Sequence, residues 1–310
     1  MSRNLLPALL VCLACVPAAH AVDITVATAD FDRWVYPFNQ TPGTRTTAST
    51  FAAFTPGAFD DRDAQMLVGF NPASYSQPLP TLLPGQSYRV LEATVTATTI
   101  GVGSFTYDPT YDSFTTYGPG ATETDSDAGR PVTLTGAGLR SPFIGFSFNP
   151  GGPPFYTEGG AFAFGDPTAE GVRLTFAADA SGTDVSNNVT DGFDFTPFAV
   201  GQTSLTPGDT VLAGTTLEFE IDVTDAAIQA YLVDGLDSGL FFTLSSLHSA
   251  SFGGAPTFPA FATRENTGVG AVAPSLSFTV VAVPEPAAAA VAVIAVVGLA
   301  ARRRRGSADA

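Results

Sequence analysis

Leu217-Glu218-Phe219-Glu220-Ile221-Asp222-Val223 alternates apolar and acidic side chains without interruption. Successive side chains of a β-strand point to opposite faces, so this alternation predicts a strand with one face in the core and one in water. Half-buried strands of this kind are typical of antiparallel sheets. The segment therefore predicts an antiparallel, all-β body.

The rest of the body repeats this β character. Residues 88–100 form the longest run, which is rich in Val and Thr and follows a Pro-Gly turn signal. A short helix is predicted over residues 226–232, with Thr224 or Asp225 as its N-cap. Together these features predict an antiparallel β-sandwich with one short helix and long loops. Further strands are predicted at residues 24–27, 132–135, 143–148, 172–177, 240–245 and 276–283.

The composition excludes several classes of protein. The chain has 310 residues, and its 13 arginines, absent lysines and 29 acidic residues give a net charge of −16. Such a chain repels phosphate backbones, so no nucleic-acid partner is expected. A hydrophobic fraction of 45% is too high for a wholly disordered chain. The 31 glycines and 24 prolines are also atypical of a helical protein.

Residues 1–21 have the three parts of a secretory signal peptide. Arg3 provides a positive start, residues 5–16 are apolar, and Ala19-His20-Ala21 matches an A-x-A cleavage site. We therefore predict export, with a mature body that starts at residue 22. Both cysteines of the chain lie in this signal segment, so the exported body is expected to have no disulfide.

Residues 284–310 contain three consecutive features. Pro284-Glu285-Pro286 follows a predicted strand, residues 287–301 carry no polar side chain, and four arginines come next. A helix over residues 287–301 would span about 22 Å, less than the hydrocarbon core of a bilayer. The apolar character of this segment still predicts a transmembrane helix, with the arginines on the cytoplasmic side. This stop cluster comprises Arg302, Arg303, Arg304 and Arg305.

The order of these three features resembles the PEP-CTERM sorting signal, with Pro284, Glu285 and Pro286 as its motif. The resemblance implies export by a Gram-negative bacterium and recognition by a membrane-embedded exosortase. It also implies processing and placement at the cell surface, often where exopolysaccharide is made. The expected partners are the export machinery, the exosortase, the membrane before processing and, as a candidate, extracellular polysaccharide. The expected location is the inner membrane for the precursor, and then the cell surface or the extracellular matrix.

The body, residues 22–283, resembles jelly-roll modules known as DNRLRE domains, which are related to alginate-type carbohydrate-binding modules. The resemblance implies a β-sandwich of jelly-roll type. Residues 101–216 lie outside the resemblance and are interpreted as an insertion. The segments that carry the resemblance are residues 62–70, 90–96, 221–224, 239–242, 261–266 and 274–278.

No catalytic constellation is apparent in the sequence. His248 is the only histidine beyond the signal segment, and no nucleophile elbow surrounds it. We expect it to be a surface residue at the end of a strand. One histidine without cysteine cannot form the usual zinc site. A carboxylate pair of a polysaccharide-degrading enzyme stays open as an alternative, because acids are abundant although no pair stands out.

Two acidic segments stand out. One is the turn Asp60-Asp61-Arg62-Asp63, and the other is a loop-rich region that contains Asp108, Asp112, Asp125 and Asp127. Oxygen-rich loops suit a structural Ca²⁺, which takes six to eight oxygen ligands, but no D-x-D-x-D-G loop is present. The competing interpretation is that these acids are solvated and keep the protein soluble. No other cofactor is expected.

Tyrosines accompany the same acidic region. Tyr107, Tyr111 and Tyr117 are the candidate glycan-binding residues, because sugars stack on exposed aromatic faces. The alternative is that these rings pack in the core or against loops, as aromatic side chains commonly do.

These observations predict an exported, non-enzymatic protein with a structural or adhesive role at the cell surface. A carbohydrate-binding module and a polysaccharide-degrading enzyme are the two alternatives. Both terminal segments carry more basic than acidic residues, so the body between them is even more acidic than the whole chain. This acidity favours solubility and disfavours simple attraction to an anionic polysaccharide.

Overall fold

The computed structural model describes residues 20–285, apart from 37–38, 40–41, 55–59, 102–103, 119, 141–174 and 251–256. Contacts divide the chain into two compact units. The larger unit comprises Asp23–Pro78 and Val90–Thr279, and the smaller comprises Met1–Val22, Leu79–Arg89 and Val280–Ala310. The larger unit therefore holds most of the predicted body, and all side chains of the candidate site belong to it.

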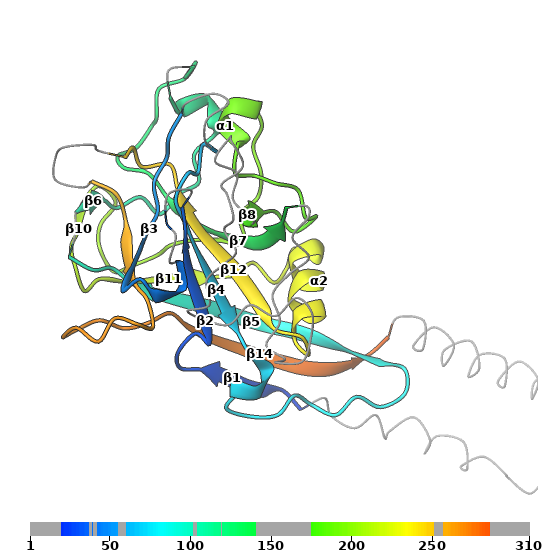
Figure 1. Ribbon diagram of the computed structural model, residues 1–310. Coiled ribbons are helices and arrows are strands. Elements are labelled where there is room, and N and C mark those ends of the chain that lie inside the picture. Colours follow the sequence, from blue (N-terminus) through cyan, green and yellow to red (C-terminus); the bar gives the residue numbers. More distant parts are fainter. Residues whose placement is uncertain are drawn as a thin grey trace, which may run out of the picture. The chain divides into compact units, whose positions relative to one another are not determined.

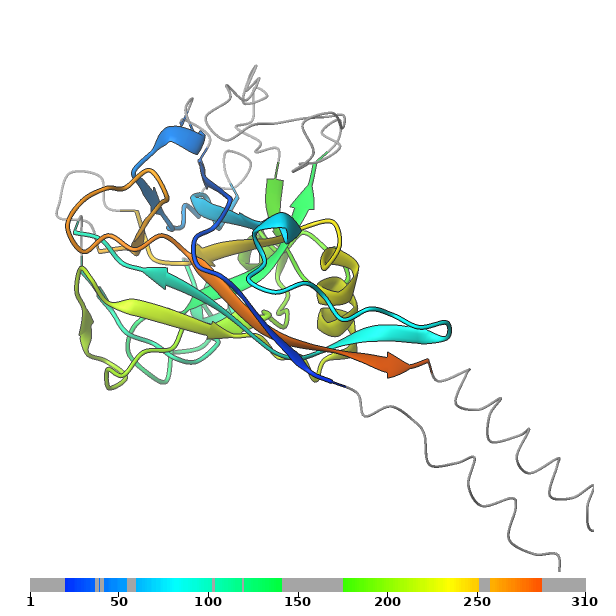
Figure 2. The same ribbon diagram turned by 90° about the horizontal axis from the view of Figure 1, so that it is seen from below.

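Strands dominate the larger unit (Figure 1). A four-stranded sheet has the order β1-β14-β5-β11, and a six-stranded sheet has the order β2-β4-β12-β7-β8, with β9 also paired to β7. Figure 2 shows the four-stranded sheet as a layer in front of the other. The pairs that β12 makes with β4 and β7, and that β11 makes with β5, are antiparallel. The protein is thus an all-β, sandwich-like structure with antiparallel sheets.

The elements have the following bounds. The four-stranded sheet contains β1 (Val22–Val26), β14 (Ser275–Pro284), β5 (Gln86–Thr98) and β11 (Thr216–Glu220). The six-stranded sheet contains β2 (Phe31–Val35), β4 (Gln65–Phe70), β12 (Leu240–Ser246), β7 (Val132–Leu139), β8 (Thr175–Ala178) and β9 (Ala199–Val200). Two small sheets pair β6 (Phe105–Thr106) with β10 (Thr210–Val211), and β3 (Thr47–Ser49) with β13 (Ala260–Ala262). The helices are α1 (Asn188–Asp191) and α2 (Ala226–Gly235), with 3₁₀ turns η1 (Pro42–Thr44), η2 (Pro72–Ser74) and η3 (Phe114–Thr116).

The alternating segment at 217–223 is confirmed as a half-buried strand up to Glu220, and residues 221–223 lie beyond the end of the strand. Along β11 the exposed and buried residues alternate, with Leu217 and Phe219 in the core. The predicted helix is also confirmed as α2. Asp225 is its N-cap, and its carboxylate accepts hydrogen bonds from the amides of Ala227 and Ile228.

Several short elements were not predicted from the sequence, and β2 and α1 show why. β2 contains Asp32 and Arg33, which are buried although they are charged, so the strand has no polar face to reveal it. The single turn of α1 is too short for a helical pattern. A residue far away in the sequence stabilises this helix: the Asp61 carboxylate accepts hydrogen bonds from the amide and hydroxyl of Thr190.

The core of the six-stranded sheet is built around Phe242 on β12. The centroid of its ring lies 6.3 Å from the ring centroids of Phe70, Phe198 and Tyr231. Gly136 is the cross-strand neighbour of Phe242 on β7. A Cβ atom there would lie 3.0 Å from the Tyr231 ring and 3.2 Å from the Phe198 ring, so glycine leaves the space that these rings fill.

The described residues include only part of the two terminal segments for which the sequence makes predictions. Within the described residues, no helix combines the length and the apolar character needed to cross a membrane. The predicted membrane helix at 287–301 and the cluster Arg302–Arg305 lie outside those residues, as does the signal segment up to residue 19. Of the sorting motif, Pro284 ends β14 and the Glu285 amide donates a hydrogen bond to the Gly85 carbonyl at 2.8 Å. Pro286 lies outside the described residues.

Candidate functional site

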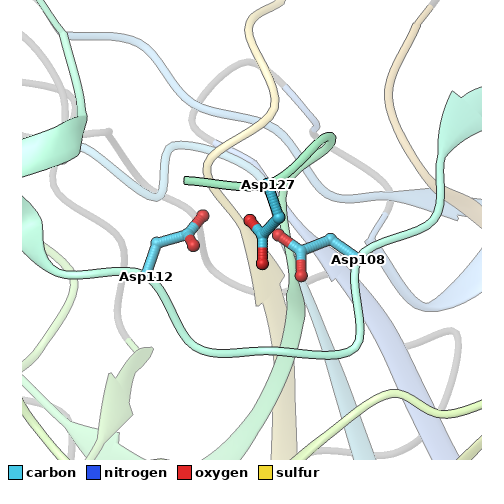
Figure 3. A group of neighbouring side chains, drawn as sticks. All are labelled: Asp108, Asp112 and Asp127. Carbon is cyan, nitrogen blue, oxygen red and sulfur yellow. The ribbon is translucent and has the colours of Figure 1, made fainter. Parts of the chain in front are cut away.

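Three carboxylates meet between two loops of the larger unit. Asp108 and Asp112 follow β6, and Asp127 precedes β7. One oxygen from each carboxylate lies within 4.8 Å of the others. Figure 3 shows the three side chains turned toward one another. We call these three residues the aspartate cluster.

Local hydrogen bonds hold the loops in place. Asp108 Oδ1 accepts from the amide and hydroxyl of Thr110, at 2.8 and 2.9 Å, which closes a turn of the kind that Asp favours. Thr110 Oγ1 also lies 2.8 Å from Asp127 Oδ2. The Tyr117 hydroxyl donates to Asp112 Oδ2 at 2.9 Å. The turn at Asp108 therefore places Thr110, and the contact from Thr110 to Asp127 joins the two loops and their acids.

Negative charge exceeds positive charge at the cluster. Within the described chain, Arg130 is the cation that contacts the cluster. The Nη1 atom of Arg130 lies 3.7 Å from Asp112 Oδ2 and bonds directly to the Asp125 carboxylate. The guanidinium also lies over the Tyr117 ring, 4.6 Å from its centroid. One arginine thus faces four carboxylates.

Burial and this crowding change the acidity of the cluster. Burial, reinforced by the charges of Asp108 and Asp125, raises the pKa of Asp112 to about 6, although Tyr117 and Arg130 oppose the shift. Burial also raises the pKa of Asp108, with smaller contributions from Asp127 and Asp125. The site would be stabilised by a proton or by a cation.

The interpretation that these acids are solvated is wrong for several of them. Asp61, Asp63, Asp108 and Asp112 are buried, whereas Asp127 is exposed. Asp61 is buried because it caps α1, and Asp112 because Tyr117 covers it. The hydrogen bonds that retain these acids come from residues distant in the sequence or from turns, which the local composition does not show.

His248 is not the surface residue that the sequence predicted. It follows β12 and is only 6% exposed, with its ring edge-on to Phe105 at 5.1 Å. Neither ring nitrogen has a hydrogen-bond partner among the residues that the structure describes. Burial, and secondarily the charge of Arg130, lower the pKa of His248 to about 3. The imidazole is therefore neutral at physiological pH.

His248 lines a cavity of about 430 Å³ beside the aspartate cluster. Asp125 and Arg130 lie on its wall, and most of the other lining side chains carry hydroxyl groups. These hydroxyl-bearing residues are Ser104, Thr106, Thr210 and Thr257.

The three candidate glycan-binding tyrosines lie in this region, but two of their rings are buried. Tyr107 and Tyr117 are each 3% exposed, so neither presents a free face for a sugar. The Tyr107 hydroxyl accepts from the Thr203 amide at 3.1 Å. Tyr111 is partly exposed and packs edge-on against Phe195, with a centroid distance of 5.4 Å. Packing, which was the alternative interpretation, describes Tyr107 and Tyr117.

Comparison with known proteins adds no assignment: no family model matches the chain, and no curated protein sequence matches it. The chemistry of this site therefore has to be argued from its own geometry.

Proposed function

We propose that this chain is an exported, non-enzymatic protein with a structural or adhesive role at the cell surface or in the extracellular matrix. In this proposal an exosortase sorts it through its PEP-CTERM signal, with residues 287–301 as the transmembrane helix. The observation that carries the proposal is the order of Pro284-Glu285-Pro286, the apolar segment and the arginine cluster, which begins at the last residue of β14. Extended Pro-Glu-Pro, which has a restricted backbone, suits recognition by an enzyme groove.

The strand order supports a jelly roll for the body. One sheet joins β1, β14, β5 and β11, and the other contains the run β4-β12-β7-β8. Sequence neighbours such as β4 and β5, or β11 and β12, lie in different sheets, as expected when Greek-key connections cross between two layers. We infer a jelly-roll sandwich to which β2 adds an edge strand.

The cavities support a non-enzymatic role. Among the cavities along the described residues, the one beside His248 has Asp125 as its single carboxylate, a second has Glu218, and two more have none. A polysaccharide hydrolase needs two carboxylates facing across the scissile bond. The buried, unpartnered His248 also lacks the oriented arrangement of a general base. The polysaccharide-degrading enzyme is therefore the weakest of the three functions.

One observation favours carbohydrate binding as a second candidate. The cavity beside His248 is lined mainly by hydroxyl groups, with Asp125 and Arg130 to fix orientation. A neutral imidazole offers one donor and one acceptor, which matches a sugar hydroxyl. Glycan-array screening of the wild-type chain and a Thr106→Val variant tests this candidate. Binding that the variant loses supports it, and no sugar-dependent binding argues against it.

Deleting residues 284–305 is expected to abolish retention at the cell surface, because the deletion removes the sorting motif, the apolar segment and the arginines. Cell fractionation with surface immunolabelling measures the distribution. Deletion of residues 306–310 alone is the matched control and should leave retention unchanged. Unaltered retention of the 284–305 deletion would refute the sorting proposal.

A further inference from the structure

We propose that the aspartate cluster, formed by Asp108, Asp112 and Asp127, is a binding site for one calcium ion, which links the loop after β6 to the segment before β7. This inference goes beyond the proposed function, since neither export nor sorting requires a cation. Two oxygens bound to one Ca²⁺ at about 2.4 Å lie at most about 4.8 Å apart. The three carboxylate oxygens are already within 4.8 Å of one another.

An unpartnered oxygen provides independent support. Asp108 is 3% exposed, and its Oδ2 is buried without a hydrogen-bond partner in the described part of the chain. Its carboxylate is turned toward Asp127 and Asp112 (Figure 3). Buried carboxylate oxygens are normally hydrogen-bonded, paired with a cation or bound to a metal. Thr110 bonds only to Oδ1, which leaves Oδ2 available to a cation inside the cluster.

The number of hydrogens available to the carboxylates also supports a bound cation. Thr110 has one hydroxyl hydrogen, yet its Oγ1 lies within 2.9 Å of oxygens from both Asp108 and Asp127. One of these two contacts therefore has no hydrogen between its oxygens when both acids are ionised. Arg130 is engaged with Asp125 and lies 3.7 Å from Asp112, so it does not neutralise the other two acids. A cation between the carboxylates would remove this repulsion.

The donor set favours calcium over other cations. All ligands in the cluster are oxygens on irregular loops, which suit the flexible coordination of Ca²⁺ better than the rigid octahedron of Mg²⁺. The cluster contains no nitrogen or sulfur ligand, so zinc and copper are disfavoured.

Calcium binding by the full chain at pH 7.5 tests the proposal. Titration calorimetry with CaCl₂ up to 10 mM should show one site, and the same calcium should raise the thermal midpoint by about 5 °C or more. Asp127→Asn should weaken the affinity at least roughly tenfold, because calcium affinity depends on ligand charge. Asp127 is exposed, so this variant is expected to fold.

Asp222→Asn is the matched control. Asp222 is exposed, as Asp127 is, and like Asp108 it accepts from the amide and hydroxyl of a threonine two residues later, but it stands outside the cluster. This variant should bind calcium like the wild type.

Three outcomes would overturn the proposal. The first is no calcium-dependent heat and no rise in the thermal midpoint at 10 mM. The second is equal calcium binding by Asp127→Asn and the wild type, which would place the ion elsewhere. The third is a rise in the midpoint that an equal ionic strength of NaCl reproduces, which would show general screening. None of these depends on the sorting signal, so they are distinguishable from a failure of the proposed function.

Discussion

Replacing Phe242 with alanine is expected to lower the free energy of unfolding by about 3–5 kcal/mol. The Phe242 side chain is fully buried, and its ring contacts Phe70, Phe198 and Tyr231. Alanine would remove these contacts and leave a cavity. The surrounding backbone belongs to β4 and β7, which are paired to β12 on both sides and therefore cannot close the gap. The loss of stability should be close to the upper end of that range.

Urea unfolding measures this change. Leu212→Ala is the control, because Leu212 is 62% exposed and its truncation should alter the free energy by less than about 0.5 kcal/mol. A loss below about 1 kcal/mol for Phe242→Ala would contradict the packing described for the six-stranded sheet.

Replacing His248 with leucine is expected to raise stability, increasingly so as the pH falls. The pKa of His248 is about 3 in the folded chain, below its ordinary value of 6.5. The unfolded chain therefore takes up the proton first, and wild-type stability falls by up to about 1.4 kcal/mol for each pH unit below 6.5. Leucine removes this loss. It also removes two buried nitrogens that lack partners.

The comparison of the variant with the wild type isolates the effect of His248. Asp32, with a pKa of about 7, and Asp112, with a pKa of about 6, stabilise the folded chain as the pH falls. Both residues remain in the variant, so their contributions cancel in the difference. The difference in unfolding free energy between His248→Leu and the wild type should therefore widen from pH 7 to pH 4. Urea unfolding at each pH measures it. A pH-independent difference would mean that the histidine is not buried as described.

The sequence predicted the elements whose signals are local. The alternation at 217–223 predicted β11, which ends at Glu220. The Val- and Thr-rich run predicted β5, and Asp225 was one of the two predicted N-caps of α2. These signals work because burial of one strand face and capping of one helix end depend on residues a few positions apart. The composition likewise indicated a β protein, and the two terminal patterns carry the sorting hypothesis.

The sequence identified the residues of the candidate site but not their arrangement. Asp108, Asp112 and Asp127 were recognised as oxygen ligands in a loop-rich region, but nothing in their spacing showed that three carboxylates converge. The burial of His248, and of the tyrosines expected to bind sugar, was not visible either. Each of these features depends on which loop lies over which residue.

The strand periodicity, the capped helix, the acidity of the body and the terminal patterns can all be read from the sequence, because each is encoded in neighbouring residues. Which charged groups are buried, and which of them meet, depends on the folding of the chain. Asp61 reaches Thr190, 129 positions away, and Tyr107 reaches Thr203, 96 positions away. The environment of an ionisable group is set by everything that excludes water from it. In a two-layer β structure that exclusion comes from strands and loops far apart in the chain.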